Sequence, residues 1–197
     1  MNSNEELVNL LVDRGYIESE DVEDAFRKVD RANFIPEEYR HRAYADRPLP
    51  IAEEATISAP HMVAKNTELL EVEEDSSVVE IGSGSGYQLA ILSELAGEVL
   101  GVEIEEELAQ KSRKSLSDRE NVTVLEGSGF GPVDDRRFDR VLYSCAVESF
   151  DETRKYLEEG GMEIAPIKTG TGQVLKKLRD GEVTDHGRVR FVPYRDG

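Results

Sequence analysis

The sequence is poor in residues on which several protein classes depend. Its 197 residues include one cysteine, no tryptophan and three histidines. The single cysteine, Cys145, excludes a disulfide framework and a cysteine-rich zinc site, and the histidines lack the paired spacing of metal ligands. No apolar run approaches the roughly 18 residues that a membrane-spanning helix needs. We therefore expect no disulfide, no metal and no membrane partner.

Positive charge is also scarce. Lys and Arg number 24 against 42 Asp and Glu, which gives a formal net charge of −18. Nucleic acids are bound through clustered Lys and Arg, so the charge argues against such a partner. Two interpretations of the acidity stay open: an ordinary soluble surface, and adaptation to a high-salt cytoplasm, where charges are screened beyond about 3 Å at 1 M. The early acids do not resemble a signal peptide, and we expect a cytoplasmic location.

The chain divides by composition into two parts that no linker separates. Residues 1–75 are predicted to form a helical N-terminal extension with a proline-containing loop or extended segment at 35–52. Residues 76–197 alternate strand-like and helix-like segments. This pattern predicts one compact α/β unit with a doubly wound, mostly parallel sheet. Consecutive strands without a helix between them predict an antiparallel edge near the C-terminus.

Apolar periodicity and capping residues place the individual elements. Helices are expected at 5–12, after a cap at Ser19, from Pro60, at 87–96, from 105 to 114 and at 150–158. Strands are expected at 77–81, 99–104, 122–125, 138–143, 162–167, 173–178 and 188–193.

A glycine-rich turn, residues 82–86, joins a predicted strand to a predicted helix. Glycines allow a sharp turn and the close approach of a ligand. Glu103 ends the next predicted strand, 21 residues after Gly82 (103 − 82), where an acid can accept hydrogen bonds from a ribose diol. Together with Glu80, the tight spacing fits S-adenosylmethionine better than a dinucleotide. The alternative to a cofactor site is a glycine turn with a purely structural role, beside an acid that lies on the surface.

Several segments, taken in order, resemble the protein-L-isoaspartate (D-aspartate) O-methyltransferase family. They are residues 33–40, 43–51 and 55–64, the glycine-rich turn, and residues 189–193. The most specific is Thr-Ile-Ser-Ala-Pro-His at 56–61, which generic methyltransferases lack. The resemblance implies an S-adenosylmethionine-dependent methyltransferase fold. It also implies methylation of the free α-carboxylate of L-isoaspartyl residues in damaged proteins and peptides, which initiates repair, by an enzyme that is often a monomer.

The resemblance also implies roles for particular residues. Ser58 is identified as the active-site serine that donates to the substrate carboxylate, and Asp46 as an acid that orients Ser58 or the substrate. Arg190 is expected to bind substrate. The residues expected to bind S-adenosylmethionine are Thr56, Ile57, Gly82, Ser83, Gly84, Ser85, Gly86, Glu103, Gly127 and Ser128.

Ordinary structural roles stay open for several of these residues. Ser58 could cap the helix that begins at Pro60, Asp46 could be a turn residue, and Arg190 could be a surface cation. A lone histidine such as His61 is expected to pack or to form hydrogen bonds rather than bind a ligand. Cys145 is expected to be a buried structural thiol.

The sequence departs from the family pattern at two places. Ser128 stands where the family usually has an aspartate that accepts a hydrogen bond from the adenine amino group. The shorter, uncharged serine is expected to weaken cofactor binding by about 1 kcal/mol, or roughly tenfold in affinity. Many family members have a glycine and a glutamine just before Thr-Ile-Ser, where this chain has Glu53, Glu54 and Ala55, and the two acids could repel an anionic substrate. These departures leave open an alternative, a divergent non-repair paralogue that acts as a cofactor-binding or regulatory protein.

Overall fold

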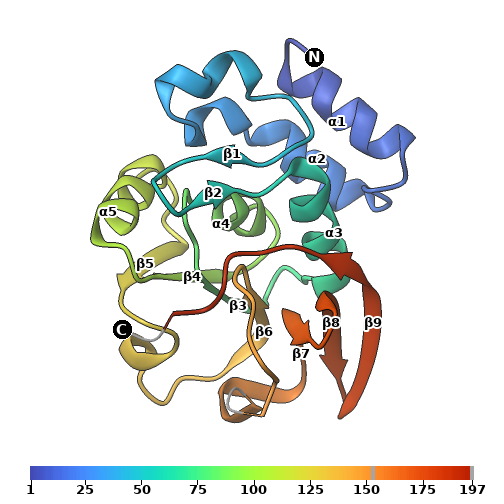
Figure 1. Ribbon diagram of the computed structural model, residues 1–197, viewed down its shortest axis with the longest axis vertical. Helices are drawn as coiled ribbons and strands as arrows, with labels where there is room; N and C mark the ends of the chain where they lie inside the picture. The colour runs from blue at the N-terminus through green and yellow to red at the C-terminus, as the bar shows by residue number, and fades with distance from the viewer. Residues whose placement is uncertain (152–153, 196–197) are drawn as a thin grey trace.

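The alternating segments of the C-terminal part form one seven-stranded sheet, in a computed structural model that describes residues 1–151 and 154–195 (Figure 1). The strand order is β5-β4-β3-β6-β7-β8-β9. The first five of these strands run parallel, and β8 and β9 add an antiparallel edge. The predicted doubly wound, mostly parallel sheet with an antiparallel edge is therefore confirmed. The strands are β3 Ser77–Ile81, β4 Glu98–Glu103, β5 Val122–Glu126, β6 Phe138–Tyr143, β7 Leu157–Thr169, β8 Gly172–Arg179 and β9 Glu182–Val189.

The two faces of the sheet are covered differently. Alternate strand residues point to opposite faces, so Val78 and Val99 join one buried cluster while Val79 and Leu100 join another. The first cluster includes apolar side chains from each of the helices α1 to α5 that the structure describes. The second is covered by loops and by the 3₁₀ turns η3 Gly131–Val133 and η4 Arg154–Tyr156. The helices of the sheet-forming part are α4 Tyr87–Ser93 and α5 Glu106–Ser115.

The N-terminal part packs onto the helical face of the sheet. Phe26 of α2 meets the ring of Tyr87 in α4 edge-on, with ring centroids 6.3 Å apart. One buried cluster therefore runs from the first helix into the sheet. The elements of this part are α1 Asn4–Asp13, α2 Glu20–Lys28, η1 Arg31–Phe34, η2 Glu37–Arg42, β1 Leu49–Pro50, β2 Thr56–Ile57 and α3 Pro60–Leu70. The helix after Ser19 forms as expected, although the Ser19 hydroxyl donates to Glu68 instead of capping the backbone.

Two predicted elements are wrong. The helix expected at 150–158 is limited to η4 in the described residues, because β7 already begins at Leu157, which pairs with Phe138. Tertiary pairing overrides the local helix propensity there. The strand expected at 188–193 overlaps β9 only at residues 188 and 189. Beyond them the chain leaves the sheet edge and crosses toward the cofactor-binding region expected from the sequence (Figure 1). None of the described helices is long and apolar enough to cross a membrane.

Candidate active site

The strand order reverses beside β3: the chain runs outward from β3 through β4 to β5, and then returns to place β6 on the other side of β3. Ligands of open α/β sheets bind at the carboxyl ends of the strands beside such a point. A cavity of about 450 Å³ lies there. Its lining comes from the carboxyl ends of β3, β4, β5 and β6, from the start of β2 with the segment before it, and from the C-terminal segment. The lining residues are Glu54, Ala55, Thr56, Ile81, Gly82, Gly84, Val102, Glu103, Ile104, Glu105, Gly127, Gly129, Ser144, Cys145, Val192, Pro193, Tyr194 and Arg195.

The glycine-rich turn follows β3 directly and forms one wall of this cavity. Gly84 has a φ of 53°, a left-handed conformation that disfavours other residues. Gly86 has a different role, because a Cβ there would lie 2.5 Å from the Ser112 hydroxyl. Its missing side chain lets α4 approach α5, and Gly86 does not line the cavity.

Glu103 lies at the end of β4, where its carboxylate faces the glycine turn. One oxygen accepts from the Gly84 amide at 2.7 Å and the other from the Glu105 amide at 3.0 Å. The side chain is buried and lines the cavity. Two backbone donors thus fix the carboxylate, and its remaining lone pairs can accept hydrogen bonds from a ligand hydroxyl.

A smaller hollow of about 40 Å³ adjoins the cavity and shares Thr56, Gly82, Gly84 and Ser144 with it. Ser58 lines this hollow, so the structure brings the expected serine to the glycine turn. Most of the other expected cofactor residues also lie in one or both spaces. The complete lining of the hollow is Thr56, Ile57, Ser58, Val63, Glu80, Gly82, Ser83, Gly84, Ser85, Tyr87, Gln88 and Ser144.

Glu80 is a fully buried carboxyl in the wall of this hollow. It accepts a hydrogen bond of 2.5 Å from the Ser144 hydroxyl, while its Oε2 has no hydrogen-bond partner in the described part of the chain. Burial raises its pKa to about 8, against the opposing effect of the Ser144 hydrogen bond. At neutral pH this carboxyl is therefore mainly protonated and uncharged.

Arg31 fixes the segment that carries Ser58. Its buried guanidinium donates to the carbonyls of Ala43 at 2.5 Å, Ser58 at 2.9 Å and Arg47 at 3.2 Å. Burial lowers the pKa of Arg31 to about 10, so the group is still charged at neutral pH. One cation therefore ties three turns of irregular backbone together.

Asp46 does not line either space. Its Oδ1 accepts from the backbone amide of His61 at 3.0 Å and lies 2.8 Å from the ring Nδ1 of His61. Asp46 thus accepts from a backbone amide that has no partner within the helix, in the first turn of α3. The N-cap residue of this helix, Ala59, has no side-chain acceptor. The idea that Ser58 caps this helix is therefore wrong, and His61 forms hydrogen bonds and packs at 5.2 Å against Tyr16, as expected.

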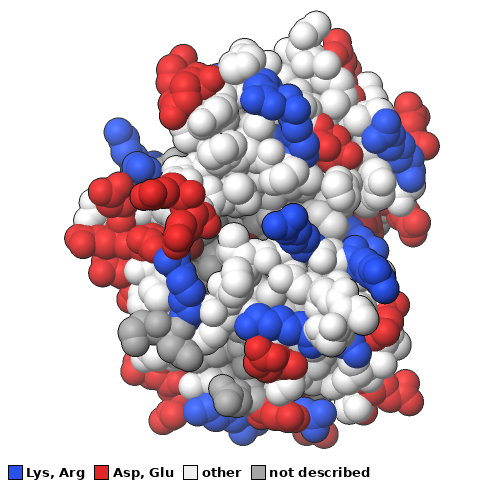
Figure 2. Space-filling model, viewed as in Figure 1, with Lys and Arg blue, Asp and Glu red and all other residues white. Residues whose placement is uncertain are grey.

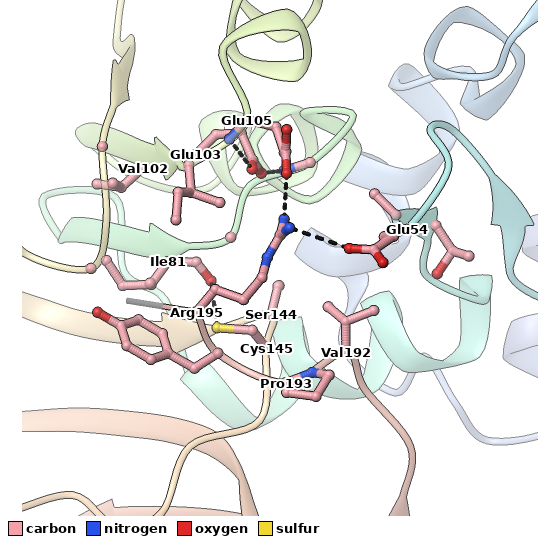
Figure 3. A pocket seen from close by; sticks show the side chains of 18 residues that line it. Glu54, Ile81, Val102, Glu103, Glu105, Ser144, Cys145, Val192, Pro193 and Arg195 are labelled. Carbon is pink, nitrogen blue, oxygen red and sulfur yellow. Dashed lines mark hydrogen bonds and ion pairs between the residues drawn. The ribbon is translucent and has the colours of Figure 1, made fainter. Parts of the chain in front are cut away.

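The substrate residue expected in the C-terminal segment, Arg190, is exposed, and no contact with either space is found for it. Gln173 holds this segment in place: it donates to the carbonyl of Phe191 at 3.0 Å and accepts from its amide at 2.6 Å. Residues 192–195 then form part of the cavity wall, and Val192, Pro193 and Arg195 are labelled there in Figure 3. The sequence contains no local signal for Tyr194 and Arg195 as lining residues, because a distant fold contact brings them here.

Ser128 also lies outside the cavity lining, although its neighbours Gly127 and Gly129 belong to it. Cys145 does line the cavity, and its thiol is buried. Burial raises the pKa of Cys145 to about 12, and the nearby Glu103 and Glu80 carboxyls add to the effect. The thiol is therefore unreactive at neutral pH. No cluster of three metal-ligating side chains is found across residues 1–151 and 154–195.

Comparison with known proteins gives one consistent result over the whole chain. Residues 2–197 match a family model described as protein-L-isoaspartate(D-aspartate) O-methyltransferase. A relative named protein-L-isoaspartate O-methyltransferase from Aliivibrio salmonicida is 39% identical, with 100% of this chain and 98% of the relative covered. A relative of the same name from Ignicoccus hospitalis is 41% identical, with 95% of each chain covered.

Solved structures agree with the sequence relatives. A Plasmodium falciparum structure, described as a protein-L-isoaspartate O-methyltransferase in complex with S-adenosyl-L-homocysteine, has a TM-score of 0.89 and 25% identity, with both chains fully covered. Another structure described as a protein-L-isoaspartate O-methyltransferase has a TM-score of 0.84 and 25% identity, with 98% of this chain and 66% of that chain covered. The methyltransferase type of fold expected from the sequence is thereby confirmed.

Proposed function

Since the chain belongs to the protein-L-isoaspartate (D-aspartate) O-methyltransferase family, we propose that its two adjoining spaces carry out the family's transfer with the residues found there. The enzyme methylates the free α-carboxylate of L-isoaspartyl residues with S-adenosylmethionine. One observation carries the assignment of the site: Ser58 lines a hollow that opens beside the cavity of the glycine turn and Glu103. The non-repair alternative has no such observation in its favour.

The larger cavity suits S-adenosylmethionine in size and in chemistry. Its volume of about 450 Å³ lies within the range of small-molecule sites. The glycine turn leaves backbone exposed where a side chain would fill the space, Glu103 offers acceptors for a ribose, and Ile81, Val102 and Ile104 supply an apolar surface. When bound, this cofactor supplies an electrophilic methyl group on a sulfonium.

The residues around the hollow would act mainly by positioning. An isoaspartyl carboxylate is ionised at neutral pH and needs no general base. The Ser58 hydroxyl can donate to it and fix its direction, and Arg31 holds the Ser58 backbone in place. Alignment of this kind can contribute several kcal/mol to the rate. We assign Thr56, Ile57 and the turn 82–86 to the cofactor side, with Gly86 acting through helix packing.

Glu80 has a consistent role in this arrangement. An ionised carboxylate beside Ser58 would repel the anionic substrate, whereas the raised pKa keeps Glu80 mainly protonated at neutral pH. Asp46 does not contact the substrate in this arrangement. It holds the first turn of α3 in place behind the Ser58 segment. Gly127 contributes backbone to the cavity, and Arg190 remains available on the surface for the substrate chain.

We also propose roles for the two parts of the chain, partners, an oligomeric state and a location for the enzyme. Residues 1–75 would supply the substrate loop and residues 76–197 the cofactor-binding core. We infer isoaspartyl-containing proteins and peptides as partners, a monomeric enzyme and a cytoplasmic location. The net charge of −18 supports the inference that nucleic acids and anionic membranes are not partners.

The decisive experiment is methyl transfer from labelled S-adenosylmethionine to an isoaspartyl peptide, in molar KCl, with the matching aspartyl peptide as control. We expect transfer to the isoaspartyl peptide alone. Ser58→Ala should lower kcat by about 10- to 100-fold, because a hydrogen bond to a charged group is lost. The exposed Ser117→Ala should retain full activity. Absence of transfer by the folded, unmodified enzyme would refute the proposal.

A further inference from the structure

The last described residues form a strap across the cavity, which we define as Val192–Arg195. The strap is attached to the segment after β6: the Ala146 amide donates to the Val192 carbonyl at 2.8 Å, and the Tyr194 amide donates to the Ala146 carbonyl at 2.9 Å. Figure 1 shows this end of the chain passing in front of the sheet, between β2 above and β6 below. The strap is thus ordered by backbone hydrogen bonds up to Arg195.

The side chain of Arg195 connects two opposite walls of the cavity (Figure 3). Its Nη2 lies 2.7 Å from an oxygen of Glu105, just beyond β4, and its Nη1 lies 3.4 Å from an oxygen of Glu54, in the segment before β2. All three residues line the cavity. The guanidinium therefore closes part of the cavity mouth by ion pairs instead of by packed apolar side chains.

Ser128 holds the backbone of the same residue. Its hydroxyl donates to the Arg195 carbonyl at 2.9 Å and lies 3.3 Å from the Tyr194 hydroxyl. An ionised aspartate at this position could not donate to a carbonyl. One residue from each place where the sequence departs from the family pattern, Ser128 and Glu54, thus contacts Arg195.

We propose that Arg195 is a cofactor-retaining residue, whose ion pairs to Glu54 and Glu105 must break before a ligand leaves the cavity. This inference rests on the proposed function, because it requires the adenosyl cofactor and its product to occupy this cavity. This role accounts for both departures from the family pattern, because Ser128 holds the strap backbone and Glu54 forms an ion pair with Arg195.

The exposure of these ion pairs makes retention sensitive to salt. The side chains of Arg195, Glu105 and Glu54 are 45%, 48% and 77% exposed. Figure 2 shows acidic side chains concentrated on this side of the molecule, over α5 and the segment before β2. Ions screen such exposed pairs, so the closed mouth should open more often as the salt concentration rises.

The test measures the dissociation of S-adenosylhomocysteine from the immobilised, full-length enzyme by surface plasmon resonance. We expect Arg195→Ala to dissociate about three- to tenfold faster than the unmodified enzyme in low salt. The difference should shrink in molar KCl. Arg136→Ala is the matched control, because Arg136 forms an ion pair of similar length and exposure with Glu98 away from the cavity, at 2.6 Å with exposures of 45% and 49%.

A second variant separates retention from a purely structural effect. Ser128→Ala removes the hydroxyl that holds the strap and should also speed dissociation, with unchanged thermal unfolding of the ligand-free protein. Equal dissociation rates for Arg195→Ala, Ser128→Ala and the unmodified enzyme would overturn the retention role and leave the proposed function intact. Failure of the unmodified, folded enzyme to bind S-adenosylhomocysteine would instead refute both.

Discussion

The two sides of the active site are built from opposite kinds of interaction. On the substrate side, the Ser58 segment is held by a buried guanidinium that donates to three backbone carbonyls, next to a buried carboxyl that is mainly uncharged at neutral pH. On the cofactor side, the mouth is closed by exposed ion pairs of Arg195. The first side is therefore held by buried groups, and the second by solvent-exposed ion pairs.

This difference matches what each side has to do. A buried hydrogen bond is costly to break, because the donor and acceptor that remain cannot form hydrogen bonds with water instead. An exposed ion pair contributes about 0–1 kcal/mol and opens readily. The substrate-orienting serine is thus held on a rigid support, while the cofactor mouth can open in each catalytic cycle. Substitutions on the buried substrate side should therefore lower the stability of the fold, whereas substitutions at the cofactor mouth should change the rate of ligand exchange.

The largest effect is expected from Arg31→Met. This substitution leaves the carbonyls of Ala43, Arg47 and Ser58 buried without their donor, which should lower the free energy of unfolding by about 3 kcal/mol or more. Urea denaturation measures this loss. We also expect a fall in kcat, since the Ser58 backbone is released.

Arg40→Met is the control for Arg31→Met. Arg40 belongs to the adjacent turn η2, is 52% exposed, and forms an ion pair with Glu37, three residues earlier. Its loss should change the free energy of unfolding by less than about 0.5 kcal/mol. If the two variants lost equal stability, the contrast between a buried and an exposed cation would be wrong.

The second effect concerns Glu80 and pH. Its pKa is raised in the folded enzyme to about 8, so between the ordinary pKa of glutamate and about 8 the folded state binds more protons than the unfolded state. Its contribution to stability is therefore full at low pH and falls as the pH rises through this window, by up to about 1.4 kcal/mol per pH unit. Glu80→Gln keeps an acceptor for Ser144 and should remove this fall.

The measurement for Glu80 is the difference in free energy of unfolding between the variant and the unmodified enzyme from pH 5 to pH 9. Titrations elsewhere in the protein cancel in this difference. The variant should gain stability relative to the unmodified enzyme as the pH rises. A difference that stays constant with pH would show that the Glu80 carboxyl is ionised throughout this range and that burial does not raise its pKa.

Local patterns in the sequence predicted most of the sheet. The strands at 77–81 and 138–143 have the expected bounds, because short apolar runs between turn residues are strong local signals. The helix expected at 150–158 failed, because pairing between Leu157 and Phe138 depends on a neighbour that is distant in sequence. The end of the strand expected at 188–193 failed for a similar reason, since residues 192 and 193 belong to the strap, whose backbone partner is Ala146.

The candidate site was predictable to the extent that its residues are adjacent in sequence. The glycine turn, Glu103 and Ser58 lie in short segments whose resemblance and spacing indicate their place. The role of Arg31 depends on three carbonyls scattered over residues 43–58, and that of Arg195 depends on residues 90 and 141 positions away in sequence. These contacts form only once the chain has folded, so they produce no local pattern in the sequence.

The smallest effect is expected from Asp46, which supports α3 behind the buried substrate side. Asp46→Ala removes the acceptor of the His61 amide and should cost about 1 kcal/mol of stability, as for the loss of a helix cap. Asp46→Asn keeps an oxygen acceptor and should restore most of this loss. If Asp46 acted directly on substrate through its charge, the asparagine variant would recover stability without recovering kcat/KM. Recovery of both by asparagine would assign Asp46 to the support of α3, and recovery of neither would remove it from the supporting network.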